Sequence, residues 1–415
     1  MKILLISYSF PPNPVIGSRR WAKLVRELSK KGHEIDVIRA YHPNKNKTQW
    51  LQDVEGHVKN EFIVPLNHPY YKFQKSSILN RVFKKLVLIT LRLFISGNPL
   101  DETILWKKTF RSRLSNILTK GNYDIVIGTG PPFHYLAETA RVCTQFPKVK
   151  LHIDLRDPWV DGFVYFTELS PAEKRYETKL LTETLSVADL TTATDQALFD
   201  QLDFLSILPK KRAVVPHFYD PSELPNSSIN KKESEFIRFI FGGSLIMNDH
   251  ASYSKGFISV LNIIKQHHPS IYSRLKFDFY SNSHWFENII RNSGHDVVRF
   301  LKPIPAKEYF IKMERDYDYQ LSFINTPLKD YLLTKVAISS GLNTPIVQLG
   351  PEGTSNDRIR IEIGGFAMGS DHLIDFIKEL PKTRNKKVAK YSLEENANKL
   401  DKLLRSMACS KLSAE

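Results

Sequence analysis

Short apolar runs alternate with segments of helical periodicity along almost the whole chain, in two separate series. The first series predicts strands at 2–7, 34–39, 124–128, 149–154, 188–193 and 213–215. The second predicts strands at 236–241, 275–280, 297–300, 319–324 and 345–349. Strands that alternate with helices pair as parallel neighbours, so each series predicts an α/β domain with a doubly wound parallel sheet.

A polar, proline-bearing stretch separates the two series. We predict an N-terminal domain at 1–217, a linker at 218–235, a C-terminal domain at 236–385 and a terminal segment at 386–415 that holds an amphipathic helix. A chain of 415 residues is long enough for two domains. Open α/β sheets bind ligands beyond the carboxyl ends of their strands, so the active site is predicted in a cleft between the domains.

The charge balance favours anionic partners. Fifty-nine basic residues against 44 acidic ones leave a net charge of +15. Two cysteines cannot build a disulfide framework, and the first residues do not resemble a signal peptide. No uncharged apolar run reaches the length of about 18 residues that a membrane span needs. The expected location is the cytoplasm, with peripheral attachment to the inner face of the cell membrane.

The basic charge is concentrated at 70–120, which contains eleven basic residues and only two acidic ones, Asp101 and Glu102. Within it, residues 78–95 are helical in pattern and strongly apolar. Four basic residues interrupt this helix: Arg81, Lys84, Lys85 and Arg92. Such a helix is typical of one that lies on an anionic membrane surface. The alternative is a core helix whose basic side chains reach to solvent. Nucleic acid is not expected as a partner, because the segment lacks interleaved aromatic residues.

Two motifs of the first domain follow strands, as ligand-binding loops do. The loop at 8–17 ends in Gly17, and Ser18 is a candidate cap for the helix after it, where backbone N–H groups can meet an anion. The DLRDPW motif at 154–159 combines Asp154, Arg156 and Asp157 at a strand end. These charges predict a sugar-hydroxyl or acceptor site, or else an internal clamp of Arg156 with Asp154 or Asp157.

The second domain offers cations near helix starts. Gly243 lies in a GGS turn after the first strand of this domain, Lys255 is placed at the start of the next helix, and Lys335 at the start of another. Each lysine can hold a diphosphate. The histidines show no metal-ligand spacing. Those near strand ends are interpreted as exposed loop residues, with a place in the cleft as the alternative: His134, His217 and His250.

Several motifs in order resemble glycosyltransferase family 4 of the GT-B fold, especially the bacterial members that build surface polysaccharides. They are KILLISYSFPPNPVIGSRRWAKLVRELSKKGHEIDVI, DIVIGTGPP, DLRDPW, VPHFYD, FGGSL and TKVAISSGLNTPIV. The resemblance implies two Rossmann-like domains facing across a cleft, with the last helix crossing back to the first domain. It also implies retaining transfer of a hexosyl or N-acetylhexosaminyl group from a nucleotide-sugar to a lipid-linked glycan. No metal and no cofactor besides the nucleotide-sugar co-substrate are implied.

The resemblance matches Gly17, Lys255 and Lys335 to positions near the donor phosphates. Together with the local motifs described above, it leads to the following set of candidate residues. Asp157 and Asp330 match catalytic positions at the cleft. The donor-binding residues are Gly17, Gly243, Lys255, Lys335, Glu352 and Ser355. The acceptor-side residues are Arg19, His134, Asp154 and Arg156.

The sequence departs from the family pattern at one glutamate pair. The paired glutamates, spaced E-x7-E, fall on Asp330 and Ile338, and Asn343 replaces a usual glycine. Ile338 cannot accept a hydrogen bond from a ribose hydroxyl, so Glu352 and Ser355 are candidates to substitute for it. Two alternative functions follow: an impaired GT-B paralogue that acts as a binding or scaffold subunit, and a sugar-nucleotide epimerase. The membrane-seeking segment argues against the epimerase, because a soluble substrate needs no bilayer.

Overall fold

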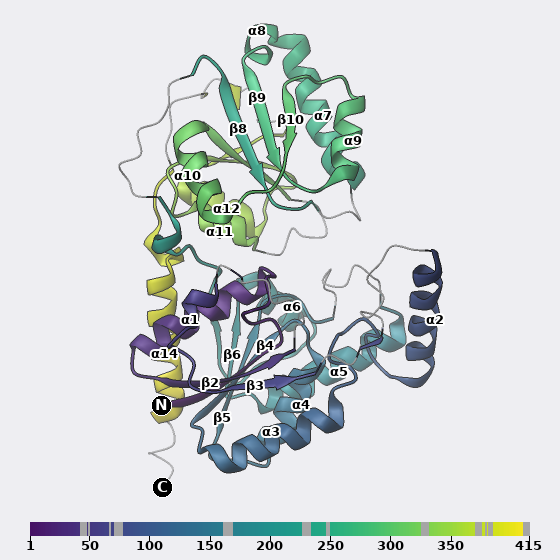
Figure 1. The fold of residues 1–415 in the computed structure, drawn as a ribbon, viewed down its shortest axis with the longest axis vertical. Coiled ribbons are helices and arrows are strands. Elements are labelled where there is room, and N and C mark those ends of the chain that lie inside the picture. Colours follow the sequence, from purple (N-terminus) through teal and green to yellow (C-terminus); the bar gives the residue numbers. More distant parts are fainter. Residues whose placement is uncertain are drawn as a thin grey trace. The chain divides into compact units, whose positions relative to one another are not determined.

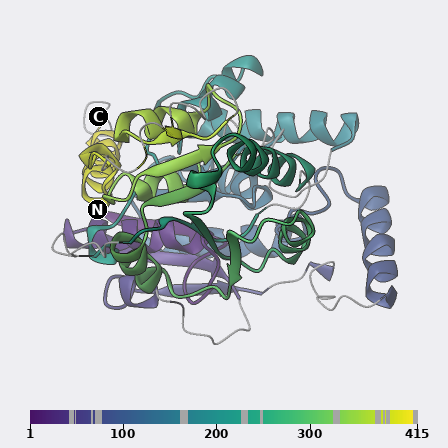
Figure 2. The ribbon, with the colours of Figure 1, turned by 90° about the horizontal axis from the view of Figure 1, so that it is seen from above.

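The computed structural model describes residues 1–41, 48, 50–65, 68–69, 78–160, 169–225, 234–245, 250–324, 332–369, 376–377, 380 and 385–409. The chain divides into two compact units (Figures 1 and 2). Unit 1 comprises Met1–Val215 together with Ala397–Glu415, and unit 2 comprises Pro216–Asn396. Each unit is an α/β structure built on its own sheet.

Unit 1 holds a parallel sheet of seven strands in the part of the chain that the structure describes. Its strands are β1 Lys2–Ser7, β2 Glu34–Ala40, β3 Glu61–Val64, β4 Ile125–Gly130, β5 Lys150–Leu155, β6 Leu190–Ala193 and β7 Arg212–Val214. Their order is β3-β2-β1-β4-β5-β6-β7. The winding reverses between β1 and β4, where Ser7 pairs with Thr129 at the carboxyl ends of the two strands. Ligands of doubly wound sheets bind at such a switch point.

The helices of unit 1 cover both faces of this sheet, except the helix at 78–94, which stands off to one side (Figures 1 and 2). They are α1 Gly17–Lys30, the 3-10 turn Leu51–Asp53, α2 Ile78–Phe94, α3 Lys107–Gly121, α4 His134–Cys143, α5 Pro171–Val187 and α6 Gln196–Phe204. Successive strand residues point to opposite faces, and Leu4 and Ile6 of β1 join the core cluster that includes residues of α3, α4 and α5. On α1, Trp21, Leu24 and Leu28 are buried at helical spacing.

The last helix, α14 Leu393–Cys409, begins in unit 2 and continues in unit 1. Ser392 precedes it, and the Ser392 hydroxyl accepts a hydrogen bond from the backbone N–H of Glu395. Within unit 1, α14 is tied to the end of α1. Lys31 donates to Asn398, and a ring nitrogen of His33 lies 2.6 Å from the Asp401 carboxylate.

Unit 2 holds a parallel sheet of six strands among its described residues. Its strands are β8 Ile237–Gly242, β9 Leu275–Tyr280, β10 Val298–Leu301, β11 Tyr319–Phe323, β12 Ile346–Leu349 and β13 Phe366–Ala367. Its helices and 3-10 turns are Pro221–Glu223, α7 His250–His267, α8 Pro269–Tyr272, α9 His284–Asn292, α10 Ala306–Asp316, α11 Thr334–Ser339, α12 Ser355–Ile363 and Ala389–Tyr391. The order β10-β9-β8-β11-β12-β13 puts the switch point between β8 and β11.

Two helix starts differ from the prediction. Helix α1 starts at Gly17, with Ile16 as N-cap and no side-chain cap, so Ser18 is not the cap; its hydroxyl is buried inside the helix's first turn. Helix α7 starts at His250, so Lys255 lies in its second turn and is exposed, not at the helix start. Both starts are polar, and the apolar spacing used for the prediction begins only after them.

The predicted interfacial segment forms a helix that is largely exposed. On α2, Leu79, Val82, Phe83, Leu86 and Leu93 recur at helical spacing and are all exposed, Leu93 to 74%. The alternative of a core helix is therefore wrong, because Leu91 is the only apolar residue of α2 that is buried among those whose side chains are described. Across the described residues, no helix has both the length and the apolar character to span a bilayer.

Candidate functional site

The side chain of Arg156 holds together the loops at the switch point of unit 1. Its guanidinium donates three hydrogen bonds to backbone carbonyls: Nη1 to Gly17 at 2.9 Å, Nε to Gly130 at 3.1 Å and Nη2 to Pro131 at 2.6 Å. A Cβ on residue 17 would lie 3.0 Å from Arg156 Nη1, so the close approach favours glycine there. Arg156 therefore fixes the first turn of α1 against the end of β4.

Asp154 is buried and bonded within unit 1. Its carboxylate accepts hydrogen bonds from Arg20 (3.2 and 3.3 Å) and from the Trp21 indole N–H (2.8 Å). The hydroxyls of Thr129 and Thr192 donate to it at 3.0 and 2.8 Å. Burial alone would raise the pKa of Asp154, but the Arg20 guanidinium and the other donors outweigh it and hold the pKa below its ordinary range. Asp154 thus joins α1 to the middle of the sheet.

The predicted internal clamp between Arg156 and Asp154 is wrong. Arg20 takes the place of Arg156 as the partner of Asp154, while Arg156 bonds to backbone carbonyls. The sequence reasoning missed Arg20 because it scored only the apolar positions of α1. The available signal was its spacing, because Arg20 lies four residues before Leu24 and therefore on the apolar face of that helix.

Asp157 follows the carboxyl end of β5 and differs from Asp154 in its surroundings. It is half-buried, and none of the described residues forms a hydrogen bond or ion pair with its side chain. Burial raises the pKa of Asp157, and the nearby Arg156 charge opposes that rise only in part. A desolvated carboxyl of this kind at a strand end is a candidate for a role in chemistry. Arg19, in the first turn of α1, is buried.

His134 is buried at the start of α4, so its interpretation as an exposed loop histidine is wrong. Its Nε2 lies 2.8 Å from Glu177, which also accepts from the Trp159 indole and the backbone N–H of Asn98. Burial would lower the pKa of His134, but Glu177 raises it overall. Burial would raise the pKa of Glu177, but His134 and the other two donors lower it overall. The pair positions the segment that follows α2.

In unit 2, the glycine turn lies at the carboxyl end of β8. Gly243 has φ +113°, in the region that favours glycine, and its N–H donates to the Tyr280 carbonyl at 3.2 Å. A Cβ on residue 243 would meet no atom of the described residues within 4 Å, so this turn leaves room on one side among them. Gly242 instead packs against the ring of Tyr309.

Lys335 reaches the same strand end from α11. Its Nζ lies 4.2 Å from the centre of the Phe241 ring, directly before the glycine turn. Among the described residues, no carboxylate pairs with Lys335, and burial lowers the pKa of its ammonium to about 8. A half-buried cation at a switch point, with no carboxylate partner among the described residues, is the arrangement that an anionic ligand completes.

The start of α12 adjoins the start of α11. The Asn356 side-chain oxygen accepts a hydrogen bond from the backbone N–H of Leu333 at 2.9 Å. Ser355 is the first residue of α12 and is buried, behind a capping box formed by Thr354 and Asp357. Glu352 is exposed in the preceding turn. Lys255 is exposed on α7, and within the described part of unit 2 it makes no contact with Lys335 or the glycine turn.

The departures from the family pattern have structural counterparts. Ile338 is 8% exposed and packs in a hydrophobic cluster with Ile240, Tyr309 and Leu342. Asn343 donates its backbone and side-chain N–H groups to Glu314 at 2.8 and 2.7 Å. A glycine at this position could form only the backbone bond. Asp330 lies outside the described residues.

The described residues contain no cluster of three or more His, Cys, Asp or Glu side chains suited to a metal ion. No protein-family model matches the chain, and no curated protein matches it.

Solved structures, in contrast, match over nearly the full length. Sucrose-phosphate synthase from Thermosynechococcus elongatus has a TM-score of 0.56 at 13% identity, covering 100% of this chain and 98% of that chain. A lipopolysaccharide outer core galactosyltransferase has 0.57 at 12%, covering 96% and 98%. UDP-GlcNAc 2-epimerase from Neisseria meningitidis has 0.54 at 12%, covering 98% and 100%. The predicted GT-B fold, with its two Rossmann-like domains, is thereby confirmed.

Proposed function

We propose that this GT-B chain is a glycosyltransferase of family 4 that moves a sugar from a nucleotide-sugar donor to an acceptor. The observation that carries the proposal is Lys335, a cation without a carboxylate partner among the described residues, at the switch point of unit 2. Several structures of the same fold hold such ligands: the Neisseria meningitidis epimerase is bound to UDP-GlcNAc, and an E. coli structure is bound with UDP-2-fluoro glucose.

The donor diphosphate is assigned to unit 2. When the sugar leaves, negative charge grows on the diphosphate, and a fixed cation in a dry site stabilises that charge. Lys335 supplies the cation, and the open side of Gly243 lets the backbone approach a phosphate. Ser355 and Glu352, near the start of α12, are assigned to the ribose or phosphates, since Ile338 is committed to the core. Lys255 of α7 is proposed as a further cation for the donor. Gly17 of unit 1 is proposed separately to contact a phosphate through its backbone at the start of α1.

The acceptor is assigned to unit 1. Asp157 contacts the acceptor or the transferring sugar, because it is the carboxyl at the end of β5 with no internal partner among the described residues. Arg156, Asp154 and His134 act as positioning residues for that edge, since each is bonded within unit 1. Arg19, in the first turn of α1, is proposed as a further acceptor-side residue. Asp330 is proposed as the carboxylate that faces a sugar hydroxyl. The transfer is proposed to retain the anomeric configuration without a metal ion.

A thermal-shift panel with UDP-, GDP-, dTDP- and CMP-sugars tests the proposal. A ligand at 100 times its dissociation constant stabilises the protein by about 2.7 kcal/mol. We expect one nucleotide class to raise the melting temperature, and Lys335→Met to remove that rise. A flat panel with a folded protein would contradict a working donor site and favour the scaffold subunit.

The epimerase alternative has support of its own, because UDP-GlcNAc 2-epimerases share the fold. It predicts that a UDP-sugar is isomerised with no acceptor present. Product analysis by NMR after incubation with the nucleotide-sugar alone separates the two activities: a transferase leaves the sugar ring unchanged.

The acceptor is proposed to be a lipid-linked glycan of a bacterial surface polysaccharide, met at the inner face of the cell membrane. Helix α2 supports this, because its apolar residues are exposed in one row while Arg81, Lys85 and Arg92 are exposed on another. A helix with this arrangement lies in the interface of an anionic bilayer, with lysine and arginine near the phosphates.

Neutralising two of these charges is expected to weaken membrane binding. Each basic residue near an anionic surface contributes about 1 kcal/mol, so Arg81→Gln with Lys85→Gln lowers vesicle affinity about thirtyfold. Co-sedimentation with phosphatidylglycerol vesicles measures it, and the matched control is Lys179→Gln with Lys210→Gln, two exposed lysines of unit 1 outside α2. Equal binding of the two double variants would contradict the surface-helix assignment.

A further inference from the structure

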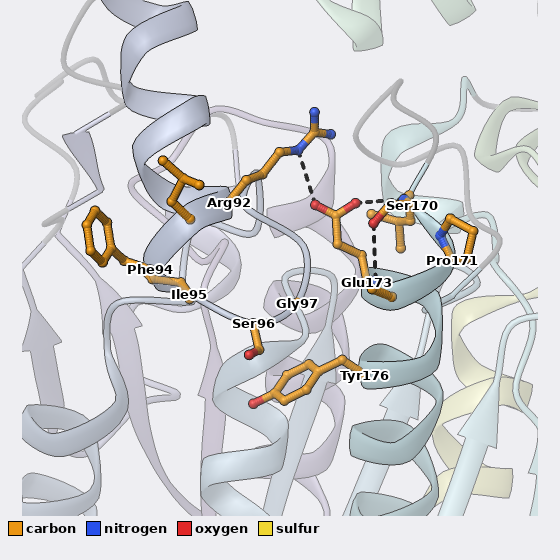
Figure 3. Close-up of a pocket in the computed structure, with 12 residues that line it drawn as sticks. Arg92, Phe94, Ile95, Ser96, Gly97, Ser170, Pro171, Glu173 and Tyr176 are labelled. Atoms are coloured by element: carbon orange, nitrogen blue, oxygen red, sulfur yellow. Dashed lines mark hydrogen bonds and ion pairs between the residues drawn. The ribbon is translucent and has the colours of Figure 1, made fainter.

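A cavity of about 730 Å³ lies in unit 1 at the carboxyl end of α2, against the start of α5 (Figure 3). Apolar side chains of Leu93, Ile95, Leu169, Pro171 and Tyr176 line it, together with the polar residues Arg92, Ser96, Ser170 and Glu173. This volume lies within the range of about 300–1,000 Å³ typical of small-molecule sites. The Tyr176 ring stacks near His134, so the His134–Glu177 pair supports the back of the cavity.

The charged side chains that line the cavity neutralise each other. Arg92 Nε lies 3.1 Å from a carboxylate oxygen of Glu173. Glu173 is also committed to the capping box of α5, where it accepts from the backbone N–H of Ser170 at 2.7 Å. Because Glu173 is already bonded in this way, the positive charge that the lining offers to a ligand lies on the terminal nitrogens of Arg92.

Arg92 keeps part of its guanidinium available at the rim. Figure 3 shows its two terminal nitrogens turned away from Glu173, and the side chain is 49% exposed. Guanidinium groups bind phosphate well, because their N–H donors match its oxygens. The rim therefore suits an anionic phosphate, and the interior suits a hydrocarbon.

The cavity continues the exposed apolar row of α2. Leu93 belongs both to that row and to the cavity lining, and Phe94, 81% exposed, follows it in the lining. An apolar surface that runs from an exposed helix into a cavity beside a basic side chain fits a molecule with a long hydrocarbon chain and a phosphate head.

We propose that this cavity binds the hydrocarbon chain of an anionic lipid, with the lipid phosphate at the terminal nitrogens of Arg92. The inference deepens the proposed function and rests on it in one respect: the lipid is the anchor of the acceptor glycan. It makes α2 and the start of α5 the lipid-recognition part of unit 1.

Titration with soluble alkyl phosphates tests the proposal. Hexyl, octyl and decyl phosphate, below their micelle concentrations, are titrated calorimetrically into the full chain, with inorganic phosphate as the chainless probe. Each methylene buried in an apolar site tightens binding about fourfold, so affinity is expected to rise steeply along this series. An affinity that does not depend on chain length, or that inorganic phosphate matches, would overturn the proposal.

Filling the cavity is expected to abolish the chain-length dependence. Ala172→Phe places a ring among the lining residues, while Thr182→Phe adds the same ring on an exposed position of α5 outside the cavity. Should Ala172→Phe not fold, Phe94→Ser in the exposed part of the lining replaces it, with a loss of at least threefold in decyl phosphate affinity expected. Binding by Ala172→Phe equal to that by Thr182→Phe would refute the site.

The same samples separate this inference from the proposed function. The thermal shift produced by the stabilising nucleotide-sugar reports on unit 2 and is expected to be unchanged by Ala172→Phe. A normal nucleotide response without chain-dependent binding overturns the lipid site alone. Chain-dependent binding without any nucleotide response supports the lipid site and counts against the glycosyltransferase.

Discussion

Lys335→Met is expected to slow sugar transfer by a factor of about 10²–10³, the cost of removing one fixed donor to a developing charge. It is also expected to weaken binding of the nucleoside diphosphate by about 1.5–3 kcal/mol, the range for a hydrogen bond to a charged group. The reason is the position of Lys335: its ammonium faces Phe241 beside the glycine turn and has no carboxylate partner in the part of unit 2 that the structure describes. Single-turnover kinetics with saturating donor separate the rate from the affinity.

Lys276→Met is the matched control for this experiment. Lys276 is also a lysine of unit 2 placed over an aromatic ring, with Nζ 5.0 Å from the centre of Phe236, but it lies on β9 away from the glycine turn. The control is expected to keep full activity. Comparable losses in both variants would show that Lys335 acts through the fold of unit 2 and not on the donor.

The lowered pKa of Lys335 predicts that binding of the nucleoside diphosphate depends on pH. Since burial brings its pKa down to about 8, the free protein loses the Lys335 charge as pH rises from 7 to 9. Affinity for the nucleoside diphosphate should therefore fall with rising pH in the wild type, by up to about tenfold per pH unit above 8. In Lys335→Met this fall should disappear, and calorimetric titration at several pH values measures it.

Asp154→Asn is expected to destabilise unit 1 by about 3–5 kcal/mol, the cost of leaving a buried charge without its partner. Arg20 has nearly no exposed side-chain surface and would face a neutral amide. The amide NH2 of an asparagine would also point at donors, the Trp21 indole or a threonine hydroxyl. Chemical unfolding followed by tryptophan fluorescence reports mainly on unit 1, which contains Trp21, Trp50, Trp106 and Trp159.

Two further variants identify the cause. Asp203→Asn breaks the exposed ion pair with Arg212 and should cost no more than about 1 kcal/mol. Arg20→Met combined with Asp154→Asn should recover part of the loss, because no uncompensated charge remains. If the double variant is less stable than Asp154→Asn alone, the unpaired charge is not the source of the loss.

Most strands of the two sheets were predictable, because strands buried in a parallel sheet are continuous apolar runs in the sequence. β1 and β9 have the predicted limits, Lys2–Ser7 and Leu275–Tyr280. The two missed strands lie at sheet edges. β3 is only four residues long, with two of them exposed, and β13 is two residues long. Such strands carry too little apolar signal to be distinguished from loops.

The candidate site was less predictable because its geometry depends on contacts distant in sequence. Arg20 meets Asp154 across 134 positions, and His134 meets Glu177 across 43. A single sequence shows which charges exist but not which pairs form. The same holds for Ile338: its identity excluded a ribose contact, while its packing against Tyr309 and Leu342 became visible only in the fold.

Unit 1 is assembled from both ends of the chain, and this gives its biosynthesis a definite order. A ribosome releases residues 1–215 first, yet His33 and Lys31 meet their partners Asp401 and Asn398 only after all of unit 2 has been made. Unit 2 is continuous in sequence and can fold as soon as it emerges, as domains generally do. Residues 1–215 are therefore synthesised before unit 2, but unit 1 is completed only after unit 2, when α14 packs onto it.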